Sequence, residues 1–259
     1  WYLDIWLDAM PEGTELIGTA MKVELPVNWK LPVENVSGDG YHLGWAHAGA
    51  MTVSSSMEVG GLAVGNATAD NSGAVSVAGM NGHAVLAALD GQSGYGFYPD
   101  PKMAVDYLEE NRATVIDRLG EYRGKKMWGS QINMTVFPNL QMLPGLNWFR
   151  VYHPKGPGKF EMWTWAMVDK EMSDDLKQMI LNNVSRTFGP AGLFDNDDGD
   201  NLQAITEQSR GWRTRQMDIY TNMALGGEHS RDEMPGVVSE GLICEQNQRY
   251  VYRRWLEMM

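Results

Sequence analysis

The chain has 259 residues, of which 43% are hydrophobic and 21% are charged, and its formal net charge is −12. This length and composition predict a soluble globular protein with a sizeable core. The acidic balance argues against binding to nucleic acid or to an anionic membrane surface, because both are recognised by basic patches. No stretch approaches the roughly 20 apolar residues of a membrane helix.

The single cysteine, Cys244, excludes an internal disulfide, a zinc ribbon and an iron–sulfur cluster held within this chain. One free cysteine also fits a reducing cytoplasm. The first residue is Trp1, and "WYLDIWLD" lacks the basic start and the apolar core of a signal peptide. We therefore expect the sequence to begin within a longer protein.

The first hundred residues contain weak and broken patterns. Apolar spacing predicts a short helix over residues 1–10, and partial alternation predicts a strand over residues 20–30, where Pro26 marks an edge or a bulge. Residues 33–51 have helical character that glycines interrupt. Residues 54–100 are rich in Gly, Ala, Ser and Asn and predict loops with short strands near 73–82 and 93–98, which is typical of a lid or a binding loop.

Stronger patterns follow. Residues 101–122 predict an amphipathic helix. Three alternating or aromatic-rich segments with turn residues between them then predict an antiparallel meander. These strands are expected over residues 132–139, 147–154 and 160–168. Three further helices are expected over residues 173–189, 201–215 and 245–259, the first with Ser173 as N-cap. We find no repeat and no linker, so residues 1–259 are expected to form one α+β domain.

The segment "ENVSGDGYHLGWAH", residues 34–47, has the residue types of a metal site. On a helix, Asp39 and His42 are neighbours on one face, whereas His47 lies about 140° further round. The glycines at 40 and 44 would permit a bend that brings both histidines to one ion. Two His and one carboxylate with open positions form the facial triad of non-haem Fe(II) oxygenases. A structural role for both histidines is the alternative.

A second segment, "RTFGPAGLFDNDDGDN" at residues 186–201, concentrates carboxylates. It contains Asp195, Asp197, Asp198 and Asp200. A solvated acidic loop or a calcium site would explain these charges. The EF-hand pattern does not fit, because Gly199 stands where that pattern needs Asp or Asn.

Together these two segments resemble the catalytic domain of the large subunit of Rieske-type aromatic ring-hydroxylating dioxygenases. The resemblance begins with "NWKLPVENVSGDGYHLGWAH" and extends through the connecting segments to the acidic segment. The connecting segments that match are "NMTVFPNLQMLPG", "VYHPKGPGKFEMWTWAMVDKEM" and "MPGVV". The resemblance covers essentially residues 1–259 and implies a helix-grip fold, in which a curved antiparallel sheet wraps around a long helix.

The resemblance also implies a site. His42 and His47 match the two histidine ligands of a mononuclear Fe(II), and Asp198 matches the carboxylate ligand. The neighbouring Asp197 and Asp200 match no ligand. Asp39 matches an Asp that links a ligand histidine to the Rieske cluster of the adjacent subunit, and Asn35 matches an Asn close to the iron.

The family's substrate pocket maps onto mostly apolar positions. They are Val36, Leu43, Asn133, Leu143, Phe188 and Phe194. No Arg or Lys is among them, and a carboxylate substrate would need a basic partner in a dry pocket. This favours an uncharged arene, polycyclic ones included, which would receive both atoms of O2 and become a cis-dihydrodiol. Gln131 stands where relatives often have His, which puts one pocket contact in doubt.

Cofactors and partners follow from the same resemblance. The family's large subunits carry an N-terminal domain with a [2Fe–2S] Rieske cluster, and no such motif occurs in this chain. We expect that domain upstream and expect residues 1–259 alone to turn over poorly. Ferredoxin and reductase would supply electrons, and the assembly would be a homotrimer or an α3β3 complex with a small subunit.

Two other functions remain open from the sequence. The same α+β fold carries hydrophobic ligands in other proteins, and in such a carrier the histidines would be incidental. A metal-dependent hydrolase would use the same residues without O2 or a reductant. Metal analysis separates the carrier from the other two.

Overall fold

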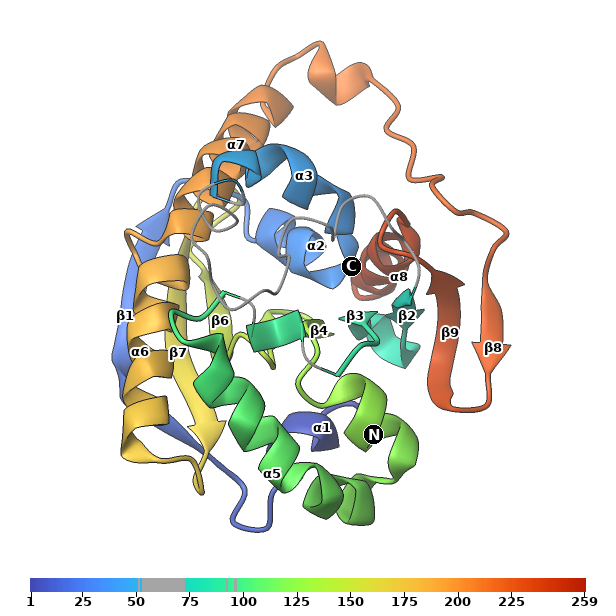
Figure 1. Cartoon of the computed structure of the whole chain (residues 1–259). Coiled ribbons are helices and arrows are strands. Elements are labelled where there is room, and N and C mark those ends of the chain that lie inside the picture. Colours follow the sequence, from blue (N-terminus) through green and yellow to red (C-terminus); the bar gives the residue numbers. More distant parts are fainter. Residues whose placement is uncertain (51, 53–72, 92, 96) are drawn as a thin grey trace.

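A computed structural model describes residues 1–50, 52, 73–91, 93–95 and 97–259. Across this part of the chain, nine strands form one antiparallel sheet in the order β1-β7-β6-β5-β4-β3-β2-β9-β8 (Figure 1). The strands are β1 (Thr14–Leu25), β2 (Ala74–Ala78), β3 (Ala84–Ala88), β4 (Ile132–Val136), β5 (Leu140–Leu143), β6 (Trp148–Pro154), β7 (Phe160–Asp169), β8 (His229–Arg231) and β9 (Met234–Glu240).

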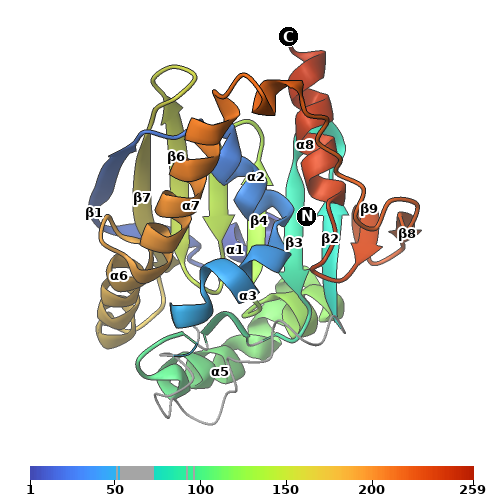
Figure 2. The same cartoon turned by 90° about the horizontal axis from the view of Figure 1, so that it is seen from above.

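Helices α2, α7 and α8 lie against one face of the sheet, and α5 crosses one end of the strands (Figure 2). The helices are α1 (Asp4–Leu7), α2 (Lys30–Gly38), α3 (Leu43–Ala46), α5 (Pro101–Leu119), α6 (Asp174–Phe188), α7 (Leu193–Ser209) and α8 (Gln246–Glu257). Shorter helical turns are η1 (Gly40–His42), η3 (Met80–Gly82), η4 (Ser93–Tyr95), η5 (Arg123–Met127) and η6 (Thr214–Gln216). None of the helices in the described ranges is long and apolar enough to cross a membrane.

The helices bury apolar stripes at helical spacing, as the sequence requires. In α6, Leu176, Ile180 and Val184 recur every four residues and are buried. Each such side chain contributes roughly 1.5–3 kcal/mol to the free energy of unfolding. The Ser173 side chain accepts a hydrogen bond from the Leu176 amide, which confirms the predicted N-cap.

A row of buried polar side chains crosses the sheet beneath α2 and α7. Thr135, Gln141, Arg150 and Thr164 are direct neighbours on successive strands. The Gln141 amide donates to Thr135 Oγ1 at 3.2 Å, and the Arg150 Nε donates to Thr164 Oγ1 at 2.8 Å. Ser37 of α2 hydrogen-bonds Thr135 across the layers at 2.8 Å. Because buried polar groups are costly unless paired, this row fixes α2 at one position on the sheet.

The α+β class and the antiparallel sheet with its helices confirm the predicted fold. The meander corresponds to β4, β6 and β7, and the helices predicted over 101–122, 173–189 and 245–259 correspond to α5, α6 and α8. The sequence did not predict β3, β5, β8 or β9, which are short or contain Pro and Gly. The single-domain interpretation of residues 1–259 stays a prediction.

Several element predictions were wrong. The helix predicted over residues 1–10 is confined to Asp4–Leu7. The strand predicted over 20–30 runs from Thr14 to Leu25, because Gly18, at a φ of +71°, permits an irregularity that keeps β1 paired with β7 on both sides. Residues 93–95 form a helical turn in place of a strand. The predicted loop residues 54–72 lie outside the described part of the chain.

The largest error concerns the acidic segment. A solvated loop was one alternative for this segment, and a helix was predicted only over 201–215. The structure instead has α7 from Leu193 to Ser209. Asp195, Asp197 and Asp198 are therefore helical. A loop would leave their relative orientation open, whereas a helix sets a fixed angle between successive side chains.

Asp169, the last residue of β7, is a buried carboxyl that accepts a hydrogen bond from the Tyr107 hydroxyl at 3.1 Å. Burial raises the pKa of Asp169 to about 7, and the Tyr107 hydrogen bond only partly opposes this shift. The folded state thus binds this proton more tightly than the unfolded state does. Its contribution to stability is complete below pH ~4 and is lost as the pH rises through about 7.

We predict that Asp169→Asn flattens this pH dependence. The free energy of unfolding of the unsubstituted chain should fall between pH 5 and pH 8. In the variant this fall should be smaller by on the order of 3 kcal/mol. Urea unfolding at the two pH values measures the difference. Asp117→Asn, at an exposed position of α5, is the control. Parallel profiles for Asp169→Asn and the unsubstituted chain would contradict the assignment.

Candidate metal centre

The two histidines are brought together by a break after α2. The helix ends at Gly38, and Asp39 leaves the helical conformation with φ −84° and ψ 66°. The Asp39 carboxylate then accepts a hydrogen bond from the His42 amide at 3.0 Å and caps the turn that follows. His42 and His47 bracket the short helix α3. The irregular backbone therefore removes the separation of about 140° that a continuous helix would impose.

Two glycines of this segment, Gly38 and Gly40, pack closely against other parts of the chain. A Cβ at Gly38 would lie 2.6 Å from the Gln248 side-chain oxygen in α8. A Cβ at Gly40 would lie 2.8 Å from the Leu242 Cβ and 2.9 Å from the Leu242 carbonyl oxygen. The end of α2 and the turn after it thus press directly against the C-terminal part of the chain, which holds the turn that carries His42.

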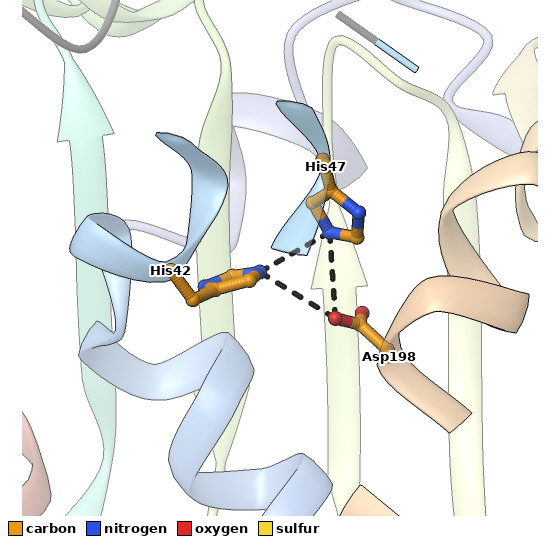
Figure 3. A group of neighbouring side chains, drawn as sticks. All are labelled: His42, His47 and Asp198. Atoms are coloured by element: carbon orange, nitrogen blue, oxygen red, sulfur yellow. Dashed lines mark hydrogen bonds and ion pairs between the residues drawn. The ribbon is translucent and has the colours of Figure 1, made fainter. Parts of the chain in front are cut away.

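The third candidate ligand comes from α7, which follows a tight turn after α6. Gly189 and Gly192 approach the backbone closely there, since a Cβ at either position would lie 2.3–2.5 Å from a carbonyl oxygen of α6. Asp198 is in the second turn of α7 and projects toward the histidines (Figure 3). Residues far apart in the sequence therefore meet between α3 and α7.

Three atoms converge on one point. His42 Nε2 and His47 Nε2 are 3.2 Å apart, and Asp198 Oδ1 lies 3.6 Å from the first and 3.4 Å from the second (Figure 3). Atoms bound to one ion at about 2.1 Å lie about 3.0–3.4 Å apart at octahedral and tetrahedral angles. Two of the three distances lie in this range and the third exceeds it by 0.2 Å, so the spacing and the donor types suit a divalent ion such as Fe(II).

The other ring nitrogens orient the two imidazoles. His42 Nδ1 contacts the Asp39 carbonyl oxygen and lies 3.5 Å from the Asp39 carboxylate. His47 Nδ1 lies 3.2 Å from Asp197 Oδ2. Each acceptor favours the tautomer with hydrogen on Nδ1, which leaves the Nε2 lone pair directed at the common point. The Asn35 amide donates to Asp198 Oδ1 at 3.3 Å and holds that carboxylate.

Electrostatics favour a positive charge at this point. Burial lowers the pKa of His42, but the hydrogen bond to Asp39 and the charge of Asp198 outweigh burial and raise it overall. Burial raises the pKa of Asp198, but the contacts with His47 and His42 outweigh burial and lower it. A proton and a metal ion therefore compete for the same nitrogens, and metal binding would release protons.

An aromatic wall borders the site. The Phe194 ring meets the His47 ring edge to face at a centroid distance of 5.0 Å. Phe188 stacks on Phe194 at 5.3 Å, and Trp148 packs on Phe188 at 5.5 Å. Phe97 meets Phe194 edge to face at 5.4 Å. Of the two predicted pocket phenylalanines, Phe194 therefore contacts a candidate ligand, and Phe188 stacks on Phe194.

The remaining predicted pocket positions lie in α2, in α3 and on the face of the sheet that α2 covers. Asn133 and Leu143 point to the side of the sheet that faces α2, because Thr135 and Gln141, two residues from each, contact α2. Val36 belongs to α2. With Asn35 and Asp198 it lines a small hollow that is partly open to solvent. Leu43, the half-buried first residue of α3, directly follows His42.

Sequence reasoning missed three residues of this site. It set Asp197 aside, yet Asp197 contacts His47, whereas Asp200 is exposed. It also gave no role to Arg150 or Asp195, which form a buried ion pair beside the site. Asp197 and Asp198 are adjacent in the sequence, and both contact His47. The sequence could have suggested this only if α7 had been recognised as a helix.

Comparison with known proteins identifies the family. Residues 14–259 match the family model of the ring hydroxylating alpha subunit (catalytic domain). The chain belongs to this family. Its catalytic domains hold a mononuclear non-haem iron, which agrees with the donor set described above. The resemblance seen in the sequence is therefore confirmed.

Named relatives agree with this assignment. The chain is 36% identical over 260 residues to the large oxygenase component of the naphthalene 1,2-dioxygenase system of Pseudomonas aeruginosa. The alignment covers 98% of this chain and 56% of that protein. It is 33% identical to the benzene 1,2-dioxygenase subunit alpha of Pseudomonas putida, with 100% and 57% coverage. The chain thus spans about half the length of these relatives.

A solved structure of naphthalene 1,2-dioxygenase with indole bound in the active site has a TM-score of 0.85 to this chain at 30% identity. The match covers 98% of this chain and 57% of the other. A likeness of this extent confirms that the sheet and its helices are arranged as in a ring-hydroxylating dioxygenase.

We predict that His42→Ala abolishes stoichiometric iron binding, because two donors remain where three are needed. Anaerobic loading with Fe(II), removal of unbound metal and iron analysis measure the loss. His229→Ala, at an exposed histidine distant in sequence from the site, is the control and should bind one iron. One equivalent of iron in His42→Ala would argue that the histidines are structural.

A second prediction concerns Asp197. Asp197→Ala should weaken Fe(II) affinity by about 10–100-fold, because His47 loses the acceptor that orients its ring. Asp200→Ala, three residues along the same helix, should change the affinity less than twofold. Titration with a competing chelator provides both values. Equal effects of the two substitutions would remove the orienting role from Asp197.

Proposed function

We propose that this chain is the catalytic domain of a terminal oxygenase. The reaction adds both atoms of O2 to adjacent carbons of an uncharged arene and yields a cis-dihydrodiol. One observation carries the proposal: two imidazole nitrogens and one carboxylate oxygen converge within 3.6 Å beside an aromatic wall. We further propose that residues 1–259 form one domain.

In this proposal His42, His47 and Asp198 hold Fe(II). A bound Fe(II) with this ligand set supplies open positions at which O2 can be activated. The two imidazoles bind as neutral ligands, since each has its one N–H hydrogen on Nδ1, where it is donated to Asp39 or Asp197. Asn35 restrains the Asp198 carboxylate by its hydrogen bond, so that one oxygen stays directed at the ion.

The reaction needs electrons from outside the domain. An arene, O2, two electrons and two protons together give the dihydrodiol. We propose that a [2Fe–2S] Rieske domain, with ferredoxin and reductase, delivers these electrons. Asp39 suits the entry point, because it contacts His42 while its side chain remains partly exposed. We propose a homotrimer or an α3β3 assembly, which would bring a neighbouring subunit to Asp39, and a cytoplasmic location.

The side chains that border the site indicate the substrate class. The Phe194 ring contacts His47 and the Phe188 ring stacks on Phe194, and a flat apolar substrate is the kind that suits aromatic surroundings. The Arg150 guanidinium lies 6.0 Å from the Phe188 ring centroid, and Asp195 already neutralises it. This guanidinium is thus not free to pair with a charged arene. The names of the relatives, naphthalene and benzene dioxygenases, support an uncharged arene.

A carrier of hydrophobic ligands explains the facts less well. An apolar ligand needs no cation, yet His42, His47 and Asp198 direct lone pairs at one point, which is unfavourable unless a proton or a metal ion lies between them. A hydrolase would share the ion, but the relatives described above are named dioxygenases.

Hydrogen peroxide provides a test that needs no electron donor, because it carries O2 already reduced by two electrons. Naphthalene and one peroxide together contain the atoms of a cis-dihydrodiol. We predict that the iron-loaded chain converts naphthalene to this product with both oxygens from labelled peroxide, and that His42→Ala does not. Chromatography and mass spectrometry measure the product. Naphthalene that is bound but returned unchanged would favour the carrier.

A further inference from the structure

Arg150 and Asp195 form a buried ion pair beside the candidate metal centre. Arg150 Nη1 donates to Asp195 Oδ1 at 3.1 Å, and Nη2 donates to Asp195 Oδ2 at 2.7 Å. The exposed fractions of the two side chains are 6% and 9%. Two parallel bonds between a planar fork and a carboxylate fix direction as well as distance.

The same guanidinium contacts three elements of the fold. Its Nε donates to Thr164 Oγ1 of β7 at 2.8 Å, and Nη2 also donates to the Phe188 carbonyl oxygen at the end of α6 at 3.0 Å. The Trp148 ring packs on it at 4.5 Å. Arg150 therefore ties the sheet, the end of α6 and the first turn of α7 together.

These contacts lie directly before the candidate ligand. Asp195 is in the first turn of α7, and Asp198, three residues later, lies one turn further along the same face. The N-cap residue of α7 is Gly192, which has no side chain that could cap the helix. The ion pair between Arg150 and Asp195 instead attaches the first turn of α7 to the sheet.

The aromatic wall depends on the same contacts. Arg150 holds the carbonyl of Phe188, and the Phe188 ring stacks on Phe194, which follows Leu193 at the start of α7. Phe194 in turn touches His47. A shift of α7 relative to the sheet would thus displace a metal ligand and the wall together.

Stability alone does not explain a buried ion pair. Burying two charges costs about as much as their attraction returns, and well-packed apolar residues often serve stability equally well. A role in selecting one geometry is the better explanation. We infer that Arg150 and Asp195 are positioning residues, which set the place of Asp198 and of the Phe188–Phe194 wall. This inference rests on the proposed metal-dependent function.

Two variants separate positioning from folding. Arg150→Lys keeps the charge but replaces the two-pronged fork with a single point donor. The double variant Arg150→Met with Asp195→Leu removes both charges, so that no unpaired charge stays buried. The control is Lys159→Gln with Glu24→Gln, which removes an exposed ion pair. Far-UV circular dichroism and cooperative unfolding establish that each variant folds.

Three readouts are measured on the 259-residue chain: Fe(II) affinity under anaerobic conditions, the visible spectrum of the Co(II)-substituted protein, and amide hydrogen exchange of α7 without metal. We expect both site variants to bind Fe(II) about 10–100-fold more weakly, with an altered Co(II) spectrum and faster exchange in α7. The control should match the unsubstituted chain in all three.

A folded double variant with the affinity and Co(II) spectrum of the unsubstituted chain would overturn the inference. If the double variant does not fold, Arg150→Lys decides by the same criteria. Failure of the proposed function looks different, because the unsubstituted chain would then bind neither metal. In that case exchange in the metal-free chain decides, and unchanged exchange of α7 in both variants would overturn the positioning role.

Discussion

The structure depends on holding three lone pairs at one point. His42 Nε2, His47 Nε2 and Asp198 Oδ1 face each other at 3.2–3.6 Å, and their Nδ1 partners ensure that the imidazoles present nitrogen without hydrogen. Such an arrangement is unfavourable without a proton or a cation at its centre. The fold must therefore supply restraints on both sides of the site, because neither α3 nor α7 would keep this geometry alone.

The restraints come from polar contacts buried between the sheet and its helices. On one side, Ser37 of α2 bonds to Thr135, and the Asn247 amide of α8 donates to the Ser37 carbonyl at 2.7 Å. On the other side, Arg150 holds α7 through Asp195. Both anchors start from the same polar row on the sheet. The sheet is thus a common reference for the histidines and the carboxylate, and the aromatic wall is built on it as well.

Much of this was predictable because periodicity is a local property. The stripes of α5, α6 and α8 and the alternation in β6 and β7 are visible in the sequence. The start of α7 was not, since its four Asp and Gly199 have low helix propensity, and the tertiary contact of Asp195 with Arg150 overrides that preference. The residue pattern alone suggested two histidines and a choice among several carboxylates; the family resemblance selected Asp198. Neither the residue pattern nor the family resemblance identified Asp197, because its contact with His47 depends on how α7 packs.

Anomalous diffraction at the iron edge tests the central claim most directly. Crystals of the 259-residue chain grown anaerobically with Fe(II) should show one strong peak, about 2.0–2.3 Å from His42 Nε2, His47 Nε2 and Asp198 Oδ1. A peak at other residues, or crystals with bound iron and no peak between α3 and α7, would contradict the account.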